Sequence, residues 1–168
     1  MSDLLTRSDP IPNAPFVAEG VTISLSPPLA RYSLRARQGQ ALETLLGMKV
    51  PKRIGAIEGG IVCLGPDEWL MRAPSGTNIP MGTGLAVAAT DVSERLVCLT
   101  VEGPKAAQTI MSGCPLDLHN FAAGRATKTV YEGVEIILIR EAEDRFHVEV
   151  WRSFASWLWT ALATTASH

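Results

Sequence analysis

The stretch DVSERLVCLTVEGPKAAQTIMSGCPLDLH, residues 91–119, places a strand, a helix and an irregular turn in immediate succession. The β-rich run 95–101 ends before a Gly-Pro pair, so we predict a mostly buried strand there. A helix is predicted to begin at Pro104, because the first turn of a helix tolerates a missing N–H. Gly113 is expected to adopt the left-handed conformation just past the helix, and Pro115 prevents its continuation. The predicted helix has one apolar face, formed by Ala106, Ala107, Ile110 and Met111.

The segment that follows the helix, residues 113–119 (GCPLDLH), provides either specific chemistry or a specific shape. As a shape, Leu116 and Leu118 would cover the helix end, Asp117 would accept a turn hydrogen bond and His119 would lie at the surface. No second metal ligand lies at a suitable spacing from this His, which argues against a metal site. The sequence alone leaves both interpretations open.

Composition bounds the class of protein. The 168 residues suit one domain, and the net charge of −2 with scattered basic residues argues against a nucleic-acid surface. Cys63, Cys98 and Cys114 form no CxxC pair and are expected to be reduced, mostly buried thiols. There is no signal-peptide pattern and no apolar run of membrane-spanning length, so we expect a soluble, cytoplasmic protein without a membrane partner.

An internal repeat organises the chain. Residues 31–39 (RYSLRARQG) match 95–103 (RLVCLTVEG), and 67–73 (DEWLMRA) match 144–150 (DRFHVEV). Each unit is predicted to read strand, helix, strand, strand. Antiparallel sheets covered by helices, an α+β fold, follow from this order.

The remaining boundaries follow from periodicity and turn residues. Residues 1–19 are rich in proline and are expected to form an extended arm without regular structure, followed by repeats at about 20–90 and 91–168. Residues 81–89 contain two glycines and no clear face, which predicts a loop or a single turn. The other predicted elements are strands at 21–25, 31–37, 56–64, 68–73, 127–131, 134–140 and 145–151, and a helix at 41–46 closed by Gly47. In the strand at 31–37, the arginines are expected to form a basic outer face.

A final helix is predicted to begin at Ser153 and to lie on a sheet. Its expected buried stripe is Phe154, Trp157, Leu158, Ala161 and Leu162. Trp159 falls off this stripe, so either a buried flank or a partner surface must cover it. Trp69 or Trp151 is expected to point into the core.

No catalytic constellation is recognisable. His119, His147 and His168 are far apart in the sequence, and no phosphate-binding loop, nucleophile elbow or zinc motif occurs. Glu141, Glu143 and Asp144 are expected to be a solvated hairpin cluster. Cys114 follows a helix C-terminus, whose dipole disfavours a thiolate. We therefore expect no catalytic residue, no metal site and no cofactor bound by this chain.

Motifs along the second half carry a family resemblance. They are Asp91-Val92-Ser93 with Arg95, Gly103-Pro104, Gly113 to His119, Gly124-Arg125 with Thr129, and Arg152-Ser153-Phe154-Ala155 with Trp157 and Trp159. From about residue 64 to 163 the chain resembles the gamma subunit of heterotetrameric sarcosine oxidases. More distantly, it is similar to the folate-binding domain of the glycine cleavage aminomethyltransferase.

The resemblance implies a non-catalytic subunit of a complex that oxidises sarcosine to glycine. It further implies large alpha and beta partner subunits that carry FAD, FMN and NAD, a small delta subunit, and tetrahydrofolate as the one-carbon acceptor. The acidic residue that acts on folate in the aminomethyltransferases has no counterpart here, so folate chemistry is not carried over. The predicted partner interface consists of the arm with Cys114, Pro115, Leu116, Asp117, His119, Arg152 and Trp159.

Two alternatives remain. The first is a free-standing folate or one-carbon binding protein, with a cleft between the repeats and Arg95, Asp117 and Arg152 as polar ligands. The second is an interaction module of a different assembly.

Overall fold

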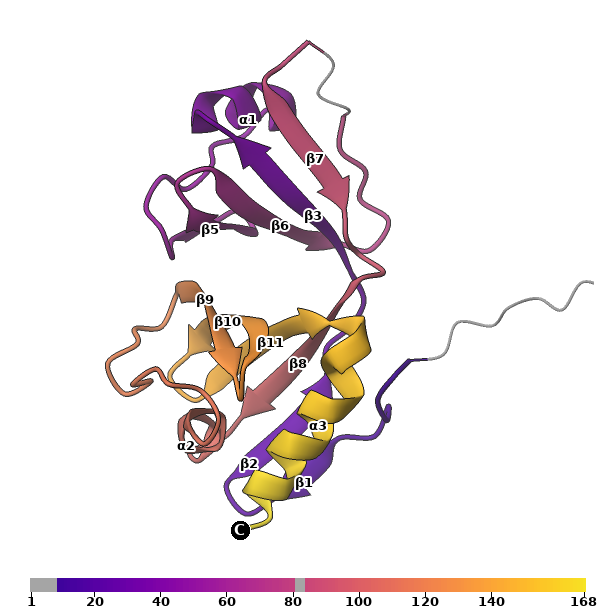
Figure 1. Cartoon of the computed structure of the whole chain (residues 1–168), viewed down its shortest axis with the longest axis vertical. Helices are drawn as coiled ribbons and strands as arrows, with labels where there is room; N and C mark the ends of the chain where they lie inside the picture. The colour runs from indigo at the N-terminus through magenta and orange to yellow at the C-terminus, as the bar shows by residue number, and fades with distance from the viewer. Residues whose placement is uncertain (1–8, 81–83) are drawn as a thin grey trace, which may run out of the picture.

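The computed structural model describes residues 9–80 and 84–168, which form two antiparallel sheets with helices on their outer sides (Figure 1). One sheet has six strands in the order β1-β2-β8-β11-β10-β9, and the other has five in the order β4-β5-β6-β3-β7. The elements in chain order are β1 (Phe16–Ala18), β2 (Val21–Leu25), β3 (Leu29–Ala36), α1 (Gly39–Leu46), β4 (Ile57–Glu58), β5 (Ile61–Gly65), β6 (Glu68–Pro74), β7 (Val87–Asp91), β8 (Leu96–Glu102), α2 (Ala106–Met111), β9 (Arg125–Tyr131), β10 (Val134–Ala142), β11 (Arg145–Trp151) and α3 (Arg152–Ala166). The predicted α+β class is confirmed.

The two sheets repeat one another strand by strand. The order β4-β5-β6-β3 in one sheet corresponds to β9-β10-β11-β8 in the other. Next to β3 lies β7, which spans the predicted boundary between the units, and next to β8 lies β2 of the first unit. The matching strand order confirms the internal repeat, and β2 links the sheet of the second unit to the first unit through the backbone.

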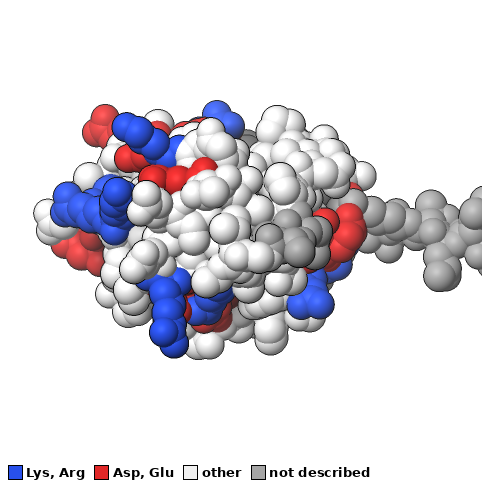
Figure 2. Space-filling model, turned by 90° about the horizontal axis from the view of Figure 1, so that it is seen from above, with Lys and Arg blue, Asp and Glu red and all other residues white. Residues whose placement is uncertain are grey.

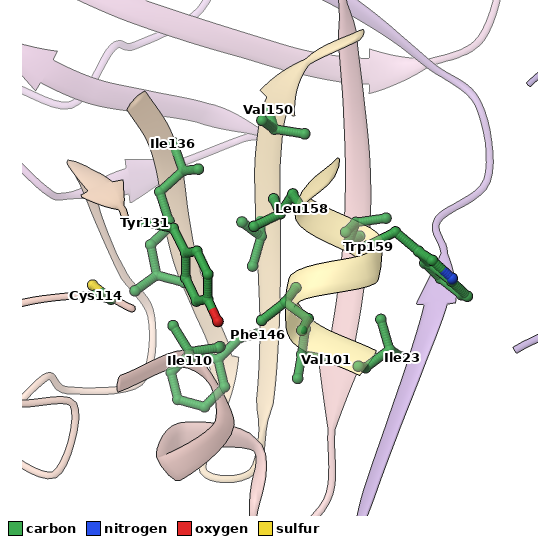
Figure 3. Close-up of a cluster of buried hydrophobic side chains, with 14 of the residues drawn as sticks. Ile23, Val101, Ile110, Cys114, Tyr131, Ile136, Phe146, Val150, Leu158 and Trp159 are labelled. Atoms are coloured by element: carbon green, nitrogen blue, oxygen red, sulfur yellow. The ribbon is translucent and has the colours of Figure 1, made fainter. Parts of the chain in front are cut away.

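Three apolar cores separate the layers. The largest lies between the six-stranded sheet and the helices α2 and α3, and includes Ile110, Phe146 and Leu158, each fully buried (Figure 3). A second core lies between α1 and the five-stranded sheet. The third and smallest lies between the two sheets, where Leu70 meets Ile139. Both faces of each sheet are therefore covered over much of their area.

Two predictions about strands were wrong. The segment 56–64 is a hairpin of β4 and β5 rather than one strand, because Gly59 and Gly60 both adopt positive φ, at 53° and 81°. Within the predicted loop at 81–89, residues 87–89 belong to β7, while 81–83 lie outside the described residues. This strand forms by pairing with β3, a long-range interaction that local propensity does not report.

The predicted N-terminal arm lies partly within the described residues. Residues 16–18 form β1, which pairs with β2, so the expectation of no regular structure was wrong for this part. Ile11 is buried in the core beneath α3 and the six-stranded sheet. Residues 1–8 lie outside the described residues.

The end of α2 differs from the prediction. Its cap residue Ser112 is right-handed, and Gly113 does not have a positive φ, so the left-handed role assigned to Gly113 was wrong. Glycine is required there for space, because a Cβ atom would lie 2.6 Å from the Tyr131 ring. By contrast, Gly47 closes α1 in the left-handed conformation as predicted.

The buried face of α3 is rotated from the predicted stripe. Its buried residues are Ala155, Leu158, Trp159 and Leu162. Phe154 and Trp157 are 44% and 39% exposed, so their assignment to the core was wrong. Trp159 occupies a buried flank of the helix, which was one of the two alternatives for it.

The predictions for Trp69 and for the cysteines are confirmed. Trp69 is buried and its indole N–H donates to the Pro51 carbonyl at 2.7 Å. The three cysteines are free and buried. Figure 2 shows basic and acidic side chains intermixed on the face seen from above. Within the described part of the chain, no helix has both the length and the apolar character needed to cross a membrane.

Candidate functional site

A buried ion triad joins the two sheets. Glu149 on β11 lies 2.8 Å from the Nε atom of Arg31 on β3 and 2.8 Å from that of Arg72 on β6. The Glu149 side chain is 0% exposed, and those of Arg31 and Arg72 are 4% and 16% exposed. The prediction that Arg31 belongs to a basic outer face was therefore wrong, since that face is covered by the other sheet.

The repeat explains why these charges meet. Arg72 and Glu149 occupy equivalent positions when residues 67–73 are aligned with 144–150. Equivalent positions near the centre of a two-fold arrangement face one another. Like charges at these positions would repel, whereas the opposite charges of Arg72 and Glu149 attract. The triad was not predicted from the sequence, although opposite charges at matched repeat positions were a signal that could have revealed it.

The triad changes the chemistry of its neighbours. Burial raises the pKa of the Cys98 thiol to about 12, and the nearby Glu149 carboxylate adds to the rise. An Nη2 atom of Arg72 lies 3.8 Å from the Cys98 sulfur. Because the thiolate is the reactive form of cysteine, Cys98 is expected to be unreactive in the folded protein.

A hydrogen-bonded row extends from Cys98 toward the surface. The Ser26 and Thr100 hydroxyls lie 2.7 Å apart, and Thr100 Oγ1 lies 3.3 Å from His147 Nδ1. His147 Nε2 lies 3.1 Å from Glu141. Burial lowers the pKa of His147, the charge of Arg72 lowers it further, and Glu141 opposes both. Thr100 is 5% exposed, so this row resembles an acid-base relay in order but has no accessible nucleophile.

The Asp-Val-Ser motif connects β7 and β8 to β3. The Ser93 hydroxyl donates to Asp91 Oδ1 at 2.6 Å and also accepts the Arg31 backbone N–H at 2.9 Å. Hydrogen bonds from Ser93 lower the pKa of Asp91. The Val92 N–H donates to the Arg31 carbonyl at 2.9 Å. The motif thus fixes the crossover between the sheets.

A cleft of about 210 Å³ opens between the sheets. Its walls are mainly apolar, and Trp69 and Trp151 both contribute to them. Lys128 and Glu68 also line it and form an ion pair at 2.7 Å. The Arg95 side chain lines the cleft and makes no ion pair or hydrogen bond with another described residue.

The three polar residues assigned to a folate cleft are not brought together. Arg95 lines the cleft, whereas Arg152 contributes to a separate cavity that includes Asp9. Asp117 lies in an exposed turn. The carbonyl of the next residue, Leu118, accepts a hydrogen bond from Arg140, which places this turn at the end of the six-stranded sheet away from the cleft. Of the three predicted ligands, the structure places Arg95 in the cleft between the repeats.

The segment 113–119 adopts the compact shape considered from sequence. Cys114 and Leu118 are buried and Leu116 is half-buried, all within the core under α2. Asp117 accepts the His119 backbone N–H at 3.0 Å and the Asn120 side-chain amide at 2.6 Å, and these bonds lower the pKa of Asp117. Pro115, Asp117 and His119 are exposed, so they are available for the partner contact that remains a prediction.

The remaining predicted interface residues lie on α3. The Arg152 Nε donates to the Glu94 carbonyl at 3.0 Å, and its guanidinium lies 3.8 Å from both Asp9 and Glu94 carboxylates. Trp159 is 9% exposed and projects toward β2, at the edge of the core (Figure 3). In the described ranges, no three His, Cys, Asp or Glu side chains are arranged to hold a metal ion.

An exposed aromatic set was not predicted. Trp151, Phe154 and Trp157 are 39%, 44% and 39% exposed, and we call them the aromatic face of α3. The Trp157 ring packs edge-on against Tyr131, with centroids 6.2 Å apart and an interplanar angle of 72°. Their three-residue spacing was visible in the sequence, but Phe154 and Trp157 were interpreted as part of a core stripe and Trp151 as one of two tryptophans that could point into the core.

Comparisons with known proteins match this chain to gamma subunits of sarcosine oxidase. The family model described as sarcosine oxidase, gamma subunit family matches residues 34–168. The chain is 32% identical to "Sarcosine oxidase subunit gamma" of Arthrobacter sp over 123 residues, covering 64% of this chain and 59% of that relative. It is 28% identical over 144 residues to the same subunit of Corynebacterium sp. (strain P-1), covering 76% and 71%. The alignment therefore spans less than two thirds of the Arthrobacter relative.

Solved structures of related fold include a sarcosine oxidase chain and an aminomethyltransferase. A chain of the heterotetrameric sarcosine oxidase from Corynebacterium sp. U-96, in complex with pyrrole 2-carboxylate, matches with a TM-score of 0.75 and 25% identity over 87% of this chain and 83% of that one. The aminomethyltransferase T of the glycine cleavage system from Bartonella henselae matches with a TM-score of 0.65 and 13% identity, over 85% and 45%, which establishes a shared fold. The chain belongs to the sarcosine oxidase gamma subunit family.

Proposed function

We propose that this chain is the gamma subunit of a heterotetrameric sarcosine oxidase that demethylates sarcosine oxidatively to glycine. The observation that carries the proposal is the family match over residues 34–168, together with the 0.75 TM-score against a chain of such an enzyme. In the proposed complex, the alpha and beta subunits hold FAD, FMN and NAD, a delta subunit completes the tetramer, and tetrahydrofolate accepts the one-carbon unit. The assembly acts in the cytoplasm.

We propose that this chain has a structural rather than a catalytic role in that complex. The titratable groups of the interior support this, because they are committed to internal contacts. Glu149 is enclosed by Arg31 and Arg72, and His147 contacts the buried Thr100. A buried charge with two partners stabilises a particular arrangement of elements and is inaccessible to a substrate.

The test is a pull-down of the tagged full-length chain from cells of its native host. The proposal expects a yellow eluate that contains larger subunits, identified by mass spectrometry as flavin-carrying sarcosine oxidase chains, and that forms peroxide when sarcosine is added. A colourless eluate that contains the chain alone would contradict it. Recovery with a different set of proteins would favour an interaction module of another assembly.

The structural role has its own test in the assembled complex. Arg95→Ala and Asp117→Ala remove exposed polar groups that a catalytic role would need. With a structural role, the kcat for sarcosine stays within about twofold of wild type in both variants, because neither side chain touches the reacting atoms. A loss of kcat of a hundredfold at unchanged subunit content would assign catalysis to this chain.

One observation favours a second candidate function, binding of a folate or another one-carbon carrier. Arg95 lines the cleft between the sheets beside apolar walls, and its guanidinium has no ion pair or hydrogen bond with another described residue. At about 210 Å³ it is smaller than typical ligand sites of roughly 300–1,000 Å³, so part of a folate would fit inside it. Titration with tetrahydrofolate would quench the fluorescence of Trp69 and Trp151, and Arg95→Gln would abolish this quenching. A titration with neither a calorimetric heat of binding nor fluorescence quenching would exclude this function.

A further inference from the structure

The solvent side of α3 lacks the charges that an exposed helix normally carries. From residue 153 to 167 the sequence contains no Lys, Arg, Asp or Glu. Surface helices of globular proteins place charged or strongly polar residues on the face turned to water. The exposed positions here are instead occupied by two aromatics, Phe154 and Trp157, and by hydroxyl residues, Ser153, Ser156, Thr160, Thr164 and Ser167. This composition, rich in aromatics and poor in charge, is that of the central part of a protein interface.

The aromatic face of α3 is held in place by the rest of the fold. Trp151 is the last residue of β11, pairs with Leu96 of β8 and lines the cleft between the sheets. Trp157 packs on Tyr131, which is 1% exposed and whose hydroxyl lies 3.0 Å from Ser112 Oγ. Rings fixed in this way lose little conformational entropy when a partner covers them, which makes them effective anchors.

The size of this face fits the centre of an interface. Given exposed fractions of 39%, 44% and 39% and roughly 200–250 Å² for each large aromatic side chain, about 250–300 Å² of aromatic surface faces water. This area approaches that of the largest apolar patch on a typical monomer, roughly 300–600 Å², which is often functional. It provides about a third of the roughly 800 Å² that each partner buries in a standard interface, and the Ser and Thr face beside it can supply more.

We infer that the aromatic face of α3, Trp151 with Phe154 and Trp157, is the docking site for an uncharged, apolar surface on a different subunit of the sarcosine oxidase complex. The inference rests on the proposed function, because the matched solved structure is a heterotetramer and so supplies a non-identical partner. The chemistry of the partner surface follows from the absence of charged side chains on α3 after Arg152, since an ionic surface would be desolvated there without compensation.

The experiment compares full-length tagged variants in recovery of the flavin-carrying subunits, identified by mass spectrometry. Phe154→Glu places a charge on the aromatic face, while Phe154→Leu keeps it apolar. Ile54→Glu is the matched control, because this apolar residue is 52% exposed on the loop before β4 and lies outside the predicted partner interface. Near-ultraviolet circular dichroism and thermal unfolding establish that each variant is folded.

The expected result is that Phe154→Glu lowers subunit recovery about tenfold or more, as at an interface hot spot, while Phe154→Leu and the control Ile54→Glu stay near wild type. Trp157→Ser is a second variant, with an expected loss in the same direction. If wild type recovers the subunits and both variants recover them equally well, the inference is overturned and the proposed function stands. If wild type recovers none of them, the proposed function itself fails, and the inference fails with it.

One more outcome distinguishes a second copy of this chain as the occupant. Sedimentation of the purified wild-type chain reports whether it associates with itself. A dimer that Phe154→Glu dissociates, combined with unchanged recovery of the flavin-carrying subunits, would overturn the inference in favour of self-association. A monomeric wild-type chain whose Phe154→Glu variant loses subunit recovery would support it.

Discussion

Replacing Glu149 by Gln is expected to destabilise the protein strongly. The carboxylate lies 2.8 Å from the Nε atoms of both Arg31 and Arg72, at a point where its own side chain is 0% exposed. The amide has nearly the same volume but no charge, so two guanidinium groups would remain buried without a counter-charge. Removing one partner of a buried ion pair costs about 3–5 kcal/mol. For a domain of this size, that loss lowers the Tm by roughly 6–20 °C.

Urea unfolding, followed by circular dichroism and tryptophan fluorescence, measures the change in free energy from the midpoint at constant m-value. Glu102→Gln is the matched control, because Glu102 pairs with Arg145 at 3.6 Å and both side chains are more than 40% exposed. An exposed pair of this kind contributes at most about 1 kcal/mol. The difference between the two variants isolates the effect of burial.

The triple replacement of Arg31, Arg72 and Glu149 by Met separates the charge from the packing. Because it leaves no buried charge unpaired, it is expected to be much less destabilising than Glu149→Gln, even though it changes three residues. A cost of less than about 1 kcal/mol for Glu149→Gln, like that of its control, would contradict a stabilising role for the triad, and so would a triple variant that is the least stable of all.

Three further predictions concern packing, pH and reactivity. Gly113→Ala is expected to cost about 1–3 kcal/mol in urea unfolding, because its Cβ would lie 2.6 Å from the buried Tyr131 ring, and a cost below 0.5 kcal/mol would contradict this. Because folding lowers the pKa of His147, the unfolded chain binds more protons, so stability is expected to fall as pH drops below the ordinary value of about 6.5. His147→Gln should flatten that part of the stability profile more than His119→Gln does; equal profiles would exclude His147 as the cause. Iodoacetamide at pH 8 is expected to leave Cys98 unmodified in the native protein and to alkylate it in urea, and fast native modification in peptide mass spectra would refute this.

Sequence patterns did not reveal that the aromatic face of α3 is exposed or that the ion triad is buried. Phe154 and Trp157 were assigned to the core because they are large and apolar, yet the helix buries Ala155 and Trp159 instead. A stripe of apolar residues predicts which residues avoid water, but it does not distinguish an internal core from a partner surface. The interface set predicted around residues 113–119 still awaits a direct test, and Arg95 is the one predicted ligand that lines the cleft.

Features that depend on neighbouring residues could be predicted from the sequence. These include α1 with its left-handed Gly47, the strands of the second unit, and the repeat itself, which residues 31–39 and 95–103 reveal. Helix caps, alternation along strands and turn glycines act within a few residues, so each can be recognised from the chain alone.

The tertiary structure alone decided which faces meet. It buried Arg31 against Glu149, formed β7 next to β3, and brought the two sheets together around a cleft that contains Arg95. Alternation along a strand identifies one apolar face, but both faces of these sheets are covered, and the second cover comes from residues more than a hundred positions away, such as Glu149 opposite Arg31. Long-range pairing of this kind depends on packing geometry rather than on local propensity, which is why no local pattern revealed it.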